Sequence, residues 1–404
     1  MWLYIIMGLL SWVGIYPMTF QILMLAGVLY CVVLIPKYKI SNFIDLFVIL
    51  YIVYIFLNAI GSDYPHKYEL LRNELIFSAF PVSFYFIAKS TGEGIEKYLK
   101  KMIVPMTVVM VIGIILYIVN PPWYSALKYA QLLDSYGYTE ATVPERMERE
   151  AFRLSSIWNT AYVIGYANGV FILFLLNKIV SGVREKKERR ITYALFVLSF
   201  VVMILAGFKS LLLAFAVSIF IFIALIRERK KRIGLIFGAG AIVLIAAITI
   251  ISIDSEYYNF FIQRFQDAMS EEGMSYRLEH TGGGIELNSL FGAGFGHYGM
   301  AAKNFNGWFI QDSQYQKTLA ELGVFGFTIF VLLLLTSGFS ALKRNTILEL
   351  CILATYMISF VGSSSISAET TFPFIFWYVL GCISYKSSSK SKINHQLKTI
   401  NRVV

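Results

Sequence analysis

The sequence predicts an all-α polytopic membrane protein with about 12 transmembrane helices. Its composition is 57% hydrophobic and only 15% charged over 404 residues, whereas soluble domains average about 45–50% apolar and about 25% charged residues. The apolar residues also form repeated stretches of roughly 18 residues, separated by short charged clusters, which is the pattern of a chain that crosses a membrane many times. We therefore expect a single integral membrane domain over residues 1–404.

The predicted spans follow the apolar stretches in chain order. Hydropathy identifies them because a segment in lipid must satisfy its own backbone hydrogen bonds, as an α-helix does. The chain begins MWLYIIMGLL, with neither a basic segment nor a small-residue cleavage site, so we expect the first span to be kept as an anchor. The expected spans are residues 2–16, 17–35, 43–60, 74–89, 102–119, 156–178, 191–207, 210–226, 233–253, 319–340, 347–361 and 372–385.

The distribution of charge predicts the orientation. The net charge is +10, and alternate loops such as REKKERR and RERKKR collect 24 of the 35 Lys and Arg residues. The positive-inside rule places these loops, both termini and a tail over about 386–404 in the cytoplasm. The basic runs therefore indicate topology at an anionic lipid surface, and we expect no nucleic-acid partner. Two long loops, about 120–155 and 254–318, fall outside the membrane.

The cysteines and histidines do not form a recognisable framework. Cys31, Cys351 and Cys382 all fall inside predicted spans, which favours neither a disulfide scaffold nor a metal knuckle. The four histidines are scattered, without metal-ligand spacing. We therefore expect no metal and no cofactor.

The first long loop ends in the stretch EREAFRLSSIWNTAYVIGYANG, which places Arg153 at the outer mouth of a span. One of the two serines that follow Leu154 is expected to cap the helix. Asn159, Tyr162 and Tyr166 then follow with helical spacing and form one polar, aromatic face. Two interpretations remain open. Arg153 is either an interfacial anchor above a face that hydrogen-bonds to another helix, or a cation above the wall of a cavity.

Further charged residues are predicted at the same outer surface. Lys209 is the charge in the tight turn AGFKSLLLAF, where it is either a lysine that reaches the lipid headgroups or a second functional cation. Arg277, Glu279 and His280 lie in the second long loop, and we expect a structural role for this histidine.

Glycines in the second long loop match a nucleotide-binding pattern in letters only. Gly294, Gly296 and Gly299 spell G-x-G-x-x-G. A dinucleotide site also requires a preceding strand and a following helix in a soluble βαβ unit, and this loop is expected outside the membrane. The glycines are therefore predicted to allow left-handed turns and close approach of the backbone. His297, which lies between them, is also expected to be structural.

The second long loop closes with the polar stretch QDSQYQKTLAELGVFG, which leads into a span. Ser313 and Gln316 fit a capping box at the start of a helix. This box leaves Asp312 unexplained, and Tyr315 lies three residues further along, where it can face the same way. An ionisable residue at the edge of a membrane cavity is a functional hypothesis in itself.

The order of these features resembles the O-antigen polymerase and O-antigen ligase superfamily of bacterial membranes, Wzy-type polymerases included. Three segments carry the resemblance over about residues 150–340: Arg-Leu-Ser-Ser before a span, Arg277 followed by NSLFGAGFGHYG, and QDSQYQKTLAELGVFG. GFKSLLLAF resembles the family's turn with a basic residue and a serine. The last segment resembles a family motif that Asp312, Ser313, Tyr315, Ala320, Glu321 and Gly323 fill here. Ligases of the family carry His where this chain has Asp312, which favours a polymerase.

The resemblance implies a GT-C-like, metal-independent, inverting membrane glycosyltransferase. Such enzymes join oligosaccharides linked to undecaprenyl diphosphate outside the cytoplasmic membrane. Arg153, Lys209 and Arg277 are then expected to meet the charge of the diphosphate. Asp312 is the expected acceptor for the proton of the attacking hydroxyl, with Glu279 in reserve.

Ser313, Tyr315, Asn159 and Tyr162 are expected to bind substrate. The lipid-linked oligosaccharide serves as donor and acceptor in the bilayer, with a chain-length regulator and a flippase as further partners. A ligase is a related alternative. A transporter or flippase is another, but it should show repeated halves with charges at the midplane, and the sequence shows neither. A structural scaffold would leave the two long polar loops unexplained.

Overall fold

The computed structural model describes a helical protein. The described residues are 16–34, 38–136, 153–157, 161–183, 185–207, 209–226, 228, 232, 289–299, 302, 309–310, 313–363 and 374–387. The fold divides into two compact units. Unit 1 comprises Met1–Gly14 and Val104–Gly284, and unit 2 comprises Ile15–Ile103 and Ile285–Val404. The predicted helical class is confirmed for the described residues.

Unit 1 is built around one buried helix. Its described helices are α7 (Ile103–Val119), α8 (Pro122–Tyr136), α10 (Ala161–Ser181), α11 (Lys186–Ala206) and α12 (Lys209–Leu225). Nearly every residue of α10 between 163 and 176 is buried, as expected for a helix that is apolar on all sides. Gly165 and Gly169 of α10 let Leu211 and Phe215 of α12 pack directly against its backbone, where added Cβ atoms would collide.

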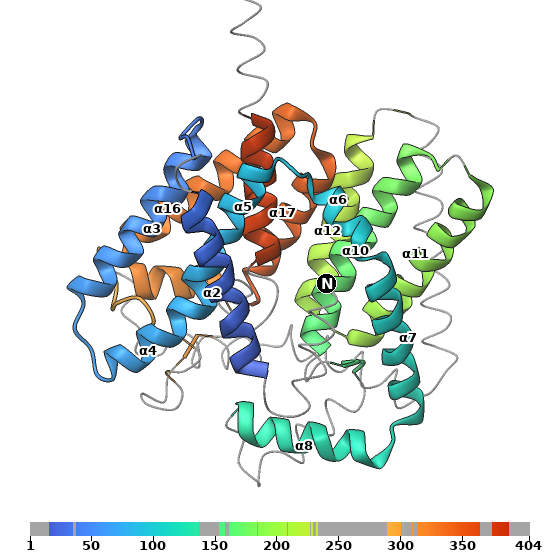
Figure 1. The fold of residues 1–404 in the computed structure, drawn as a ribbon, viewed down its shortest axis with the longest axis horizontal. Coiled ribbons are helices and arrows are strands. Elements are labelled where there is room, and N and C mark those ends of the chain that lie inside the picture. The colour runs from blue at the N-terminus through green and yellow to red at the C-terminus, as the bar shows by residue number, and fades with distance from the viewer. Residues whose placement is uncertain are drawn as a thin grey trace, which may run out of the picture. The chain divides into compact units, whose positions relative to one another are not determined.

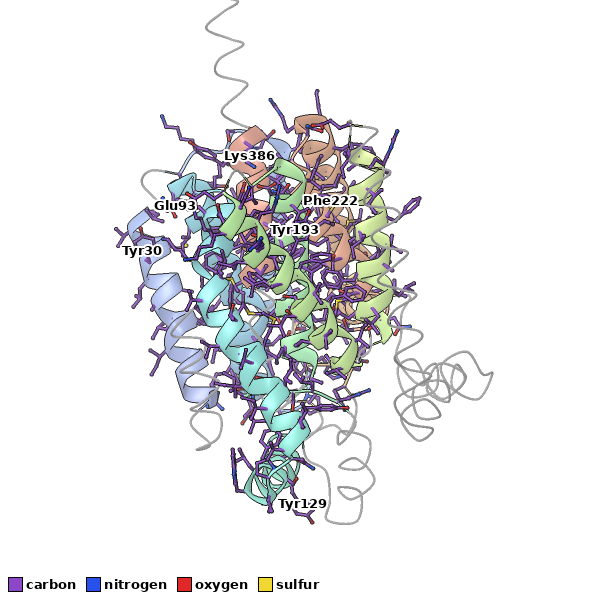
Figure 2. All side chains as sticks on the ribbon, turned by 90° about the vertical axis from the view of Figure 1, so that its right-hand side faces the viewer. Tyr30, Glu93, Tyr129, Tyr193, Phe222 and Lys386 are labelled. Atoms are coloured by element: carbon purple, nitrogen blue, oxygen red, sulfur yellow. The ribbon has the colours of Figure 1, made fainter. Side chains whose placement is uncertain are left out.

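The predicted outside loop over 120–155 contains a helix. α8 follows α7 after a single turn, and Figure 1 shows it lying across the end of α7. Tyr129 of α8 lies at one end of unit 1, away from Tyr193 near the start of α11 (Figure 2). Trp123 and Tyr129 are exposed, as is common for aromatic residues at the level of the lipid headgroups.

Unit 2 gathers helices from both ends of the sequence. They are α2 (Tyr16–Leu34), α3 (Phe43–Gly61), α4 (Lys67–Glu74), α5 (Ser83–Thr91), α6 (Ile95–Lys101), α16 (Gln314–Arg344), α17 (Ile347–Ser359) and a helix over 374–387. A π turn over Leu75–Ala79 and a 3₁₀ turn over Phe80–Val82 join α4 to α5. Pro81 lacks a backbone N–H, so this join cannot be regular α-helix. α16 lies along α3. Gly323 has a non-helical backbone and interrupts α16.

Five described helices are long and apolar enough to cross a membrane, and a sixth is added if α6 and α7 count as one broken span. They are Phe43–Gly61, Lys67–Thr91, Val163–Ser181, Lys186–Ala206 and Gln314–Arg344. The predicted spans 2–16 and 233–253 lie outside the described residues, and the others coincide with helices. The structure therefore supports a polytopic membrane protein, while the number of about 12 spans stays a prediction.

Candidate functional site

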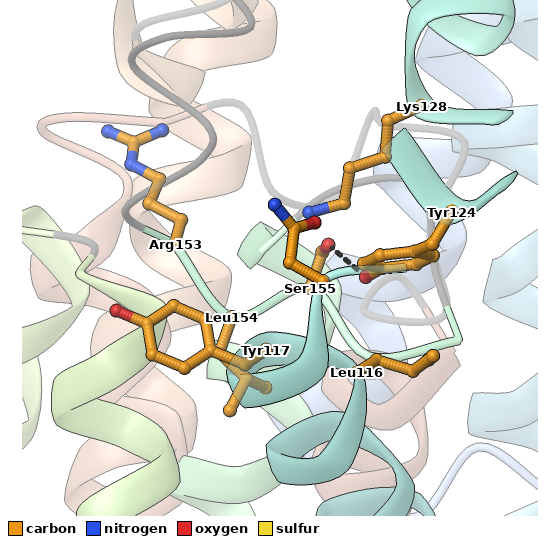
Figure 3. Close-up of a pocket in the computed structure, with 8 residues that line it drawn as sticks. Leu116, Tyr117, Tyr124, Lys128, Arg153, Leu154 and Ser155 are labelled. Carbon is orange, nitrogen blue, oxygen red and sulfur yellow. Dashed lines mark hydrogen bonds between the residues drawn. The ribbon is translucent and has the colours of Figure 1, made fainter. Parts of the chain in front are cut away.

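Arg153 lines a small polar pocket in unit 1. The pocket is small and partly open to solvent, and Figure 3 shows the side chains around it. Arg153 is 8% exposed, and its neighbour Leu154 donates its backbone N–H to Leu205 O at the end of α11 (2.9 Å). The lining residues are Leu116, Tyr117, Asn120, Tyr124, Lys128, Arg153, Leu154 and Ser155.

A second cation that the sequence interpretation missed lines the same pocket. Lys128 of α8 places its Nζ 4.5 Å from the ring centre of Tyr124 (Figure 3). The Tyr124 hydroxyl lies 2.9 Å from Ser155 Oγ and donates to Ser156 O at 2.8 Å. α8 and the segment before α10 are thereby joined. Two permanent cations beside hydroxyl and amide groups form a pocket suited to an anion.

The serine pair after Leu154 does not cap a helix, so that prediction is wrong. Ser155 and Ser156 lie in a turn, and the described part of α10 begins at Ala161. Ser156 has a positive φ of 59° and donates its hydroxyl to Val109 O of α7 at 2.7 Å. Gly113 permits this approach, because a Cβ there would lie 2.8 Å from Ser156 Cβ. The serines hold Arg153 against α7 and α8 instead.

The other predicted residues of unit 1 are placed in part. Lys209 is the first residue of α12 and follows the turn at Gly207, whose added Cβ would lie 3.7 Å from Arg153 Cγ. The structure therefore brings the turn that leads to Lys209 beside Arg153. Tyr162 is the second residue of α10. The three other candidates Asn159, Arg277 and Glu279 lie outside the described residues.

The start of α16 is tied to the end of α17 within unit 2. Ser313 is the N-cap of α16 and accepts the N–H of Gln316 at 3.3 Å, which confirms this half of the predicted capping box. The Ser313 hydroxyl donates to Phe360 O at 3.1 Å. Tyr315 donates to Met357 O at 2.9 Å, so its hydroxyl faces α17. The helix begins at Gln314, five residues before the predicted span, because the polar cap residues extend it. Asp312 itself lies outside the described residues.

A glycine-rich loop, residues 289–299, packs beside this helix. The predicted positive φ is confirmed at Gly294 (118°) and Gly296 (91°) but not at Gly299, where the predicted close approach is found instead, since an added Cβ would collide with Glu74 Oε2. A Cβ on Gly294 would lie 2.6 Å from Ser62 Oγ, so the loop backbone lies directly on the end of α3. Asn58 of α3 binds the loop twice, through its amide N–H to Phe291 O (2.6 Å) and through its Oδ1 to the N–H of Phe295 (2.7 Å).

Three charged residues are buried beneath this loop, and we call them the Glu321 cluster: Glu74, Lys317 and Glu321 are only 3%, 2% and 3% exposed. Lys317 Nζ lies 2.5 Å from Glu74 Oε1. Glu321 Oε1 accepts the backbone N–H of Tyr298 at 3.0 Å, and the backbone of Gly296 also bonds to this carboxylate. Lys317 therefore pairs with Glu74, while Glu321 is held by backbone groups of the loop. Such buried charges are costly unless they are paired and hydrogen-bonded.

His297 and Tyr298 of the loop are partly buried and pack near the buried Tyr64. His297 meets the rings of Tyr64 and Tyr298 edge-on, with ring centres 4.9 Å and 4.6 Å apart. Burial lowers the pKa of His297, which favours the neutral imidazole. Burial raises the pKa of Tyr64, and the nearby charges of Glu321 and Glu74 raise it further. These contacts agree with the expected structural role of His297.

One family model matches a continuous stretch that includes most of α11, all of α12, the loop and the first part of α16. Residues 194–331 match the family model of O-antigen ligases. The match confirms the predicted resemblance to the O-antigen ligase and polymerase superfamily. It contains Lys209, Ser313 and Tyr315, together with Lys317 and Glu321 of the cluster. No curated protein shows significant sequence similarity to the chain.

Proposed function

We propose that this protein is a membrane glycosyltransferase that polymerises oligosaccharide repeat units linked to undecaprenyl diphosphate, on the outer side of the bacterial cytoplasmic membrane. One observation carries the proposal. The match to the O-antigen ligase family crosses the point where a long apolar helix begins with the capped, polar turn at Ser313. A polar helix start that enters the membrane suits a substrate with a lipid tail and a sugar head. The product is O-antigen, capsule or exopolysaccharide.

The donor needs cations at its diphosphate. Arg153 and Lys128 line one pocket of unit 1, and Arg153 is nearly buried, where a charge acts through a low dielectric. A guanidinium group binds two phosphate oxygens at once, and the lysine adds a point charge. We propose that Lys209 and Arg277 add to this positive surface, so that the leaving diphosphate is stabilised as its negative charge grows.

The reaction is a single displacement. A sugar hydroxyl of the acceptor attacks the anomeric carbon of the donor, and a new C–O bond forms with inversion. The bond from that carbon to the diphosphate breaks, and its electron pair leaves with undecaprenyl diphosphate. The hydroxyl proton passes to the carboxylate of Asp312, which lies directly before the N-cap of α16. Glu279 is the reserve acceptor, and Ser313, Tyr315, Asn159 and Tyr162 are proposed to bind substrate.

A ligase that moves the finished glycan to a different acceptor is the second candidate, because the matching family model is described as O-antigen ligase. The carboxylate at Asp312, where ligases of the family carry His, favours the polymerase. In either case we propose a multi-pass protein with both termini in the cytoplasm, as the 24 of 35 basic residues on one side indicate. A flippase and a chain-length regulator are the proposed partners.

One experiment separates the two candidates. Purified protein in lipid nanodiscs receives only the repeat unit linked to undecaprenyl diphosphate. A polymerase forms a ladder of longer lipid-linked products from this substrate alone, whereas a ligase requires a separate acceptor. We expect the ladder, and we expect Asp312→Asn to reduce its rate by about 100-fold or more. Asp267→Asn, an aspartate of the same long loop, is the matched control and should keep the rate. No ladder, with transfer only to an added acceptor, would establish the ligase.

A further inference from the structure

α16 is a broken helix, and the glycine-rich loop occupies the break. Gly323 has φ 65° and ψ −170°, which no α-helix contains. A break in an apolar helix leaves backbone groups that lipid cannot satisfy. The loop satisfies them on both sides. Ala293 N–H bonds to Ala320 O at 2.8 Å before the break, and the N–H of Val324 bonds to Ser289 O at 3.2 Å after it.

The sequence makes this insertion specific. Gly292 of the loop and Gly323 of the helix lie so close that a Cβ on either would collide with the backbone of the other segment. Both have positive φ, at 77° and 65°. Tyr54 of α3 donates its hydroxyl to Leu322 O at 2.9 Å and so satisfies a further carbonyl beside the break. The short segment Gln314–Leu322 is therefore a separate helical piece, and its direction depends on the loop.

The Glu321 cluster connects this short piece to the loop and to α4. Lys317 and Glu321 are four residues apart and share one face of the helix. Lys317 bonds to Glu74 of α4, while Glu321 holds the loop through the backbone N–H of Tyr298. Glu74 Oε2 lies against Gly299, where a Cβ would collide with it. Buried apolar residues would stabilise the packing of this helix at least as well as buried charges do. We therefore attribute the ionic groups to specificity: they allow only one arrangement of the helix and the loop.

We propose that Glu74, Lys317 and Glu321 are positioning residues for the transfer reaction. They fix the glycine-rich loop in the break of α16, and thereby hold the first turns of that helix in one orientation. This inference rests on the proposed function, because the proposed proton acceptor Asp312 directly precedes these turns in the sequence. The three side chains act through the helix and the loop and do not touch the reacting atoms.

The test measures the loop position separately from activity. Phe291 of the loop and Phe325 of α16 stack with ring centres 5.7 Å apart, and both are exposed. A Phe291→Cys, Phe325→Cys pair therefore reports by its rate of disulfide formation whether the loop occupies the break. We expect Glu321→Gln and Lys317→Met to slow this cross-link at least several-fold. Without the cross-link, they should reduce kcat by about 100-fold, the scale of an ångström-sized misplacement, with KM for the donor within about 2-fold.

Two further variants keep the test interpretable. Lys317→Arg preserves the charge and should recover most of the kcat. Lys89→Met breaks another buried ion pair of unit 2, with Asp45, and should change neither the cross-link rate nor kcat of the folded protein. Oxidation of the cysteine pair in the Glu321→Gln protein should restore kcat, because the disulfide replaces the missing contact.

The outcomes separate this inference from the proposed function. A normal cross-link rate together with a lost kcat would overturn positioning and assign the cluster a direct chemical role. A slow cross-link with an unchanged kcat would also overturn it, because the loop would then have no influence on the reaction. If the unsubstituted protein failed to polymerise or transfer glycan while the cross-link still depended on Glu321, the proposed function would fail and the structural link would stand.

Discussion

Two buried ionic clusters among the described residues of unit 2 use the same kinds of residue differently. The first surrounds Asp45 in the first turn of α3, and we call it the Asp45 cluster. Asp45 Oδ2 accepts from the backbone N–H of Ser41 at 2.7 Å and from Lys89, and its Oδ1 accepts from Ser384 Oγ at 2.7 Å and from Tyr85. One carboxylate therefore has a cation, hydroxyl groups and the backbone of a helix cap as its partners.

The Glu321 cluster is arranged differently. Lys317 pairs with Glu74, and the carboxyl group of Glu321 accepts a backbone N–H of a loop instead of capping its own helix. Only the cap contacts of the Asp45 cluster are local. Ser41 lies four residues from Asp45, whereas Tyr85, Lys89 and Ser384 lie 40, 44 and 339 residues away, and Lys317 and Glu74 are 243 residues apart. The comparison teaches that a buried ion pair can either close a helix end or fix a distant loop. The two uses predict different mutational effects.

The largest effect should come from breaking the Asp45 cluster, and it should be an effect on stability. Asp45→Asn keeps the shape but leaves Lys89 buried without its charged partner, which costs about 3–5 kcal/mol of unfolding free energy. Activity per folded molecule should remain normal. Chemical denaturation in detergent, paired with the polymerisation assay, measures both quantities. Lys97→Met, which removes an exposed pair with Glu93, is the control and should leave the unfolding free energy unchanged. If Asp45→Asn and Glu321→Gln lowered kcat equally, the proposed difference between a stabilising Asp45 cluster and a positioning Glu321 cluster would be wrong.

The next largest effect is expected from a substitution at the break in α16, beside the Glu321 cluster. Gly323→Ala places a Cβ against the loop and forces alanine into a left-handed backbone, so the break in α16 should close or shift. We expect kcat to fall by about 100-fold and the Phe291–Phe325 cysteine cross-link to slow. Gly338→Ala is the matched control in the same helix. No atom lies within 4 Å of its added Cβ, and a helical Gly→Ala change stabilises by about 1 kcal/mol. Wild-type kcat in Gly323→Ala would show that the break has no functional role.

A smaller effect is expected from substitutions in the unit 1 pocket. They should weaken binding of the donor and leave the orientation of α16 unchanged. Arg153→Lys keeps the charge but loses the bidentate geometry, so KM for the lipid-diphosphate donor should rise by about 10-fold, the scale of one lost charge-assisted hydrogen bond. Lys128→Met should act in the same direction. The Glu321 variants should instead lower kcat. Initial rates over a range of donor concentrations separate the two patterns. An unchanged KM in both pocket variants would remove these cations from the diphosphate site.

Much of the fold could be predicted from the sequence, because local rules govern it. Apolar length predicted the long apolar helices that the structure describes, but not the shorter helices α4, α6 and α8, which lie in predicted loops. Ser313 predicted the start of α16. The glycines at 294 and 296 predicted left-handed turns. The predicted cap at Ser155 or Ser156 failed because tertiary partners, Tyr124 and Val109, bind these serines. A serine before an apolar run fits either role, and only packing decides between them.

The Glu321 cluster could not be predicted, for a physical reason. A single Gly within an apolar helical pattern is usually tolerated, so Gly323 gave no indication of a break. Lys317 and Glu321 show helical spacing, but this pattern fits a solvated helix face as well as a buried pair. Nothing local relates them to Glu74, 243 residues from Lys317. Lys128 was missed likewise, because its place in the pocket that Arg153 also lines depends on how α8 packs after α7.

The smallest predicted effect is a dependence on pH. We expect it at the Glu321 cluster and not at the Asp45 cluster. His297 lies between Gly296 and Tyr298, whose backbones bind Glu321, and its ring faces Tyr64 and Tyr298. Because burial lowers its pKa below the ordinary 6.5, the unfolded chain takes up this proton before the folded protein does. Stability from the neutral ring is complete above pH 6.5 and declines as the pH falls from there toward the lowered pKa.

We therefore expect the cross-link between cysteines at 291 and 325 to form faster at pH 7.5 than at pH 5.5, after correction for thiolate content with a dibromobimane control, a reagent that alkylates thiols. His297→Gln should reduce this difference, since an amide does not titrate. The change in unfolding free energy should stay below about 1 kcal/mol, because the ring is only half-buried and solvent screens its charge. The Asp45 cluster contains no histidine among its hydrogen-bond partners in the described residues, so the Asp45→Asn and unsubstituted proteins should lose the same stability over this pH range. A pH effect that persisted in His297→Gln would show that another group near the loop titrates.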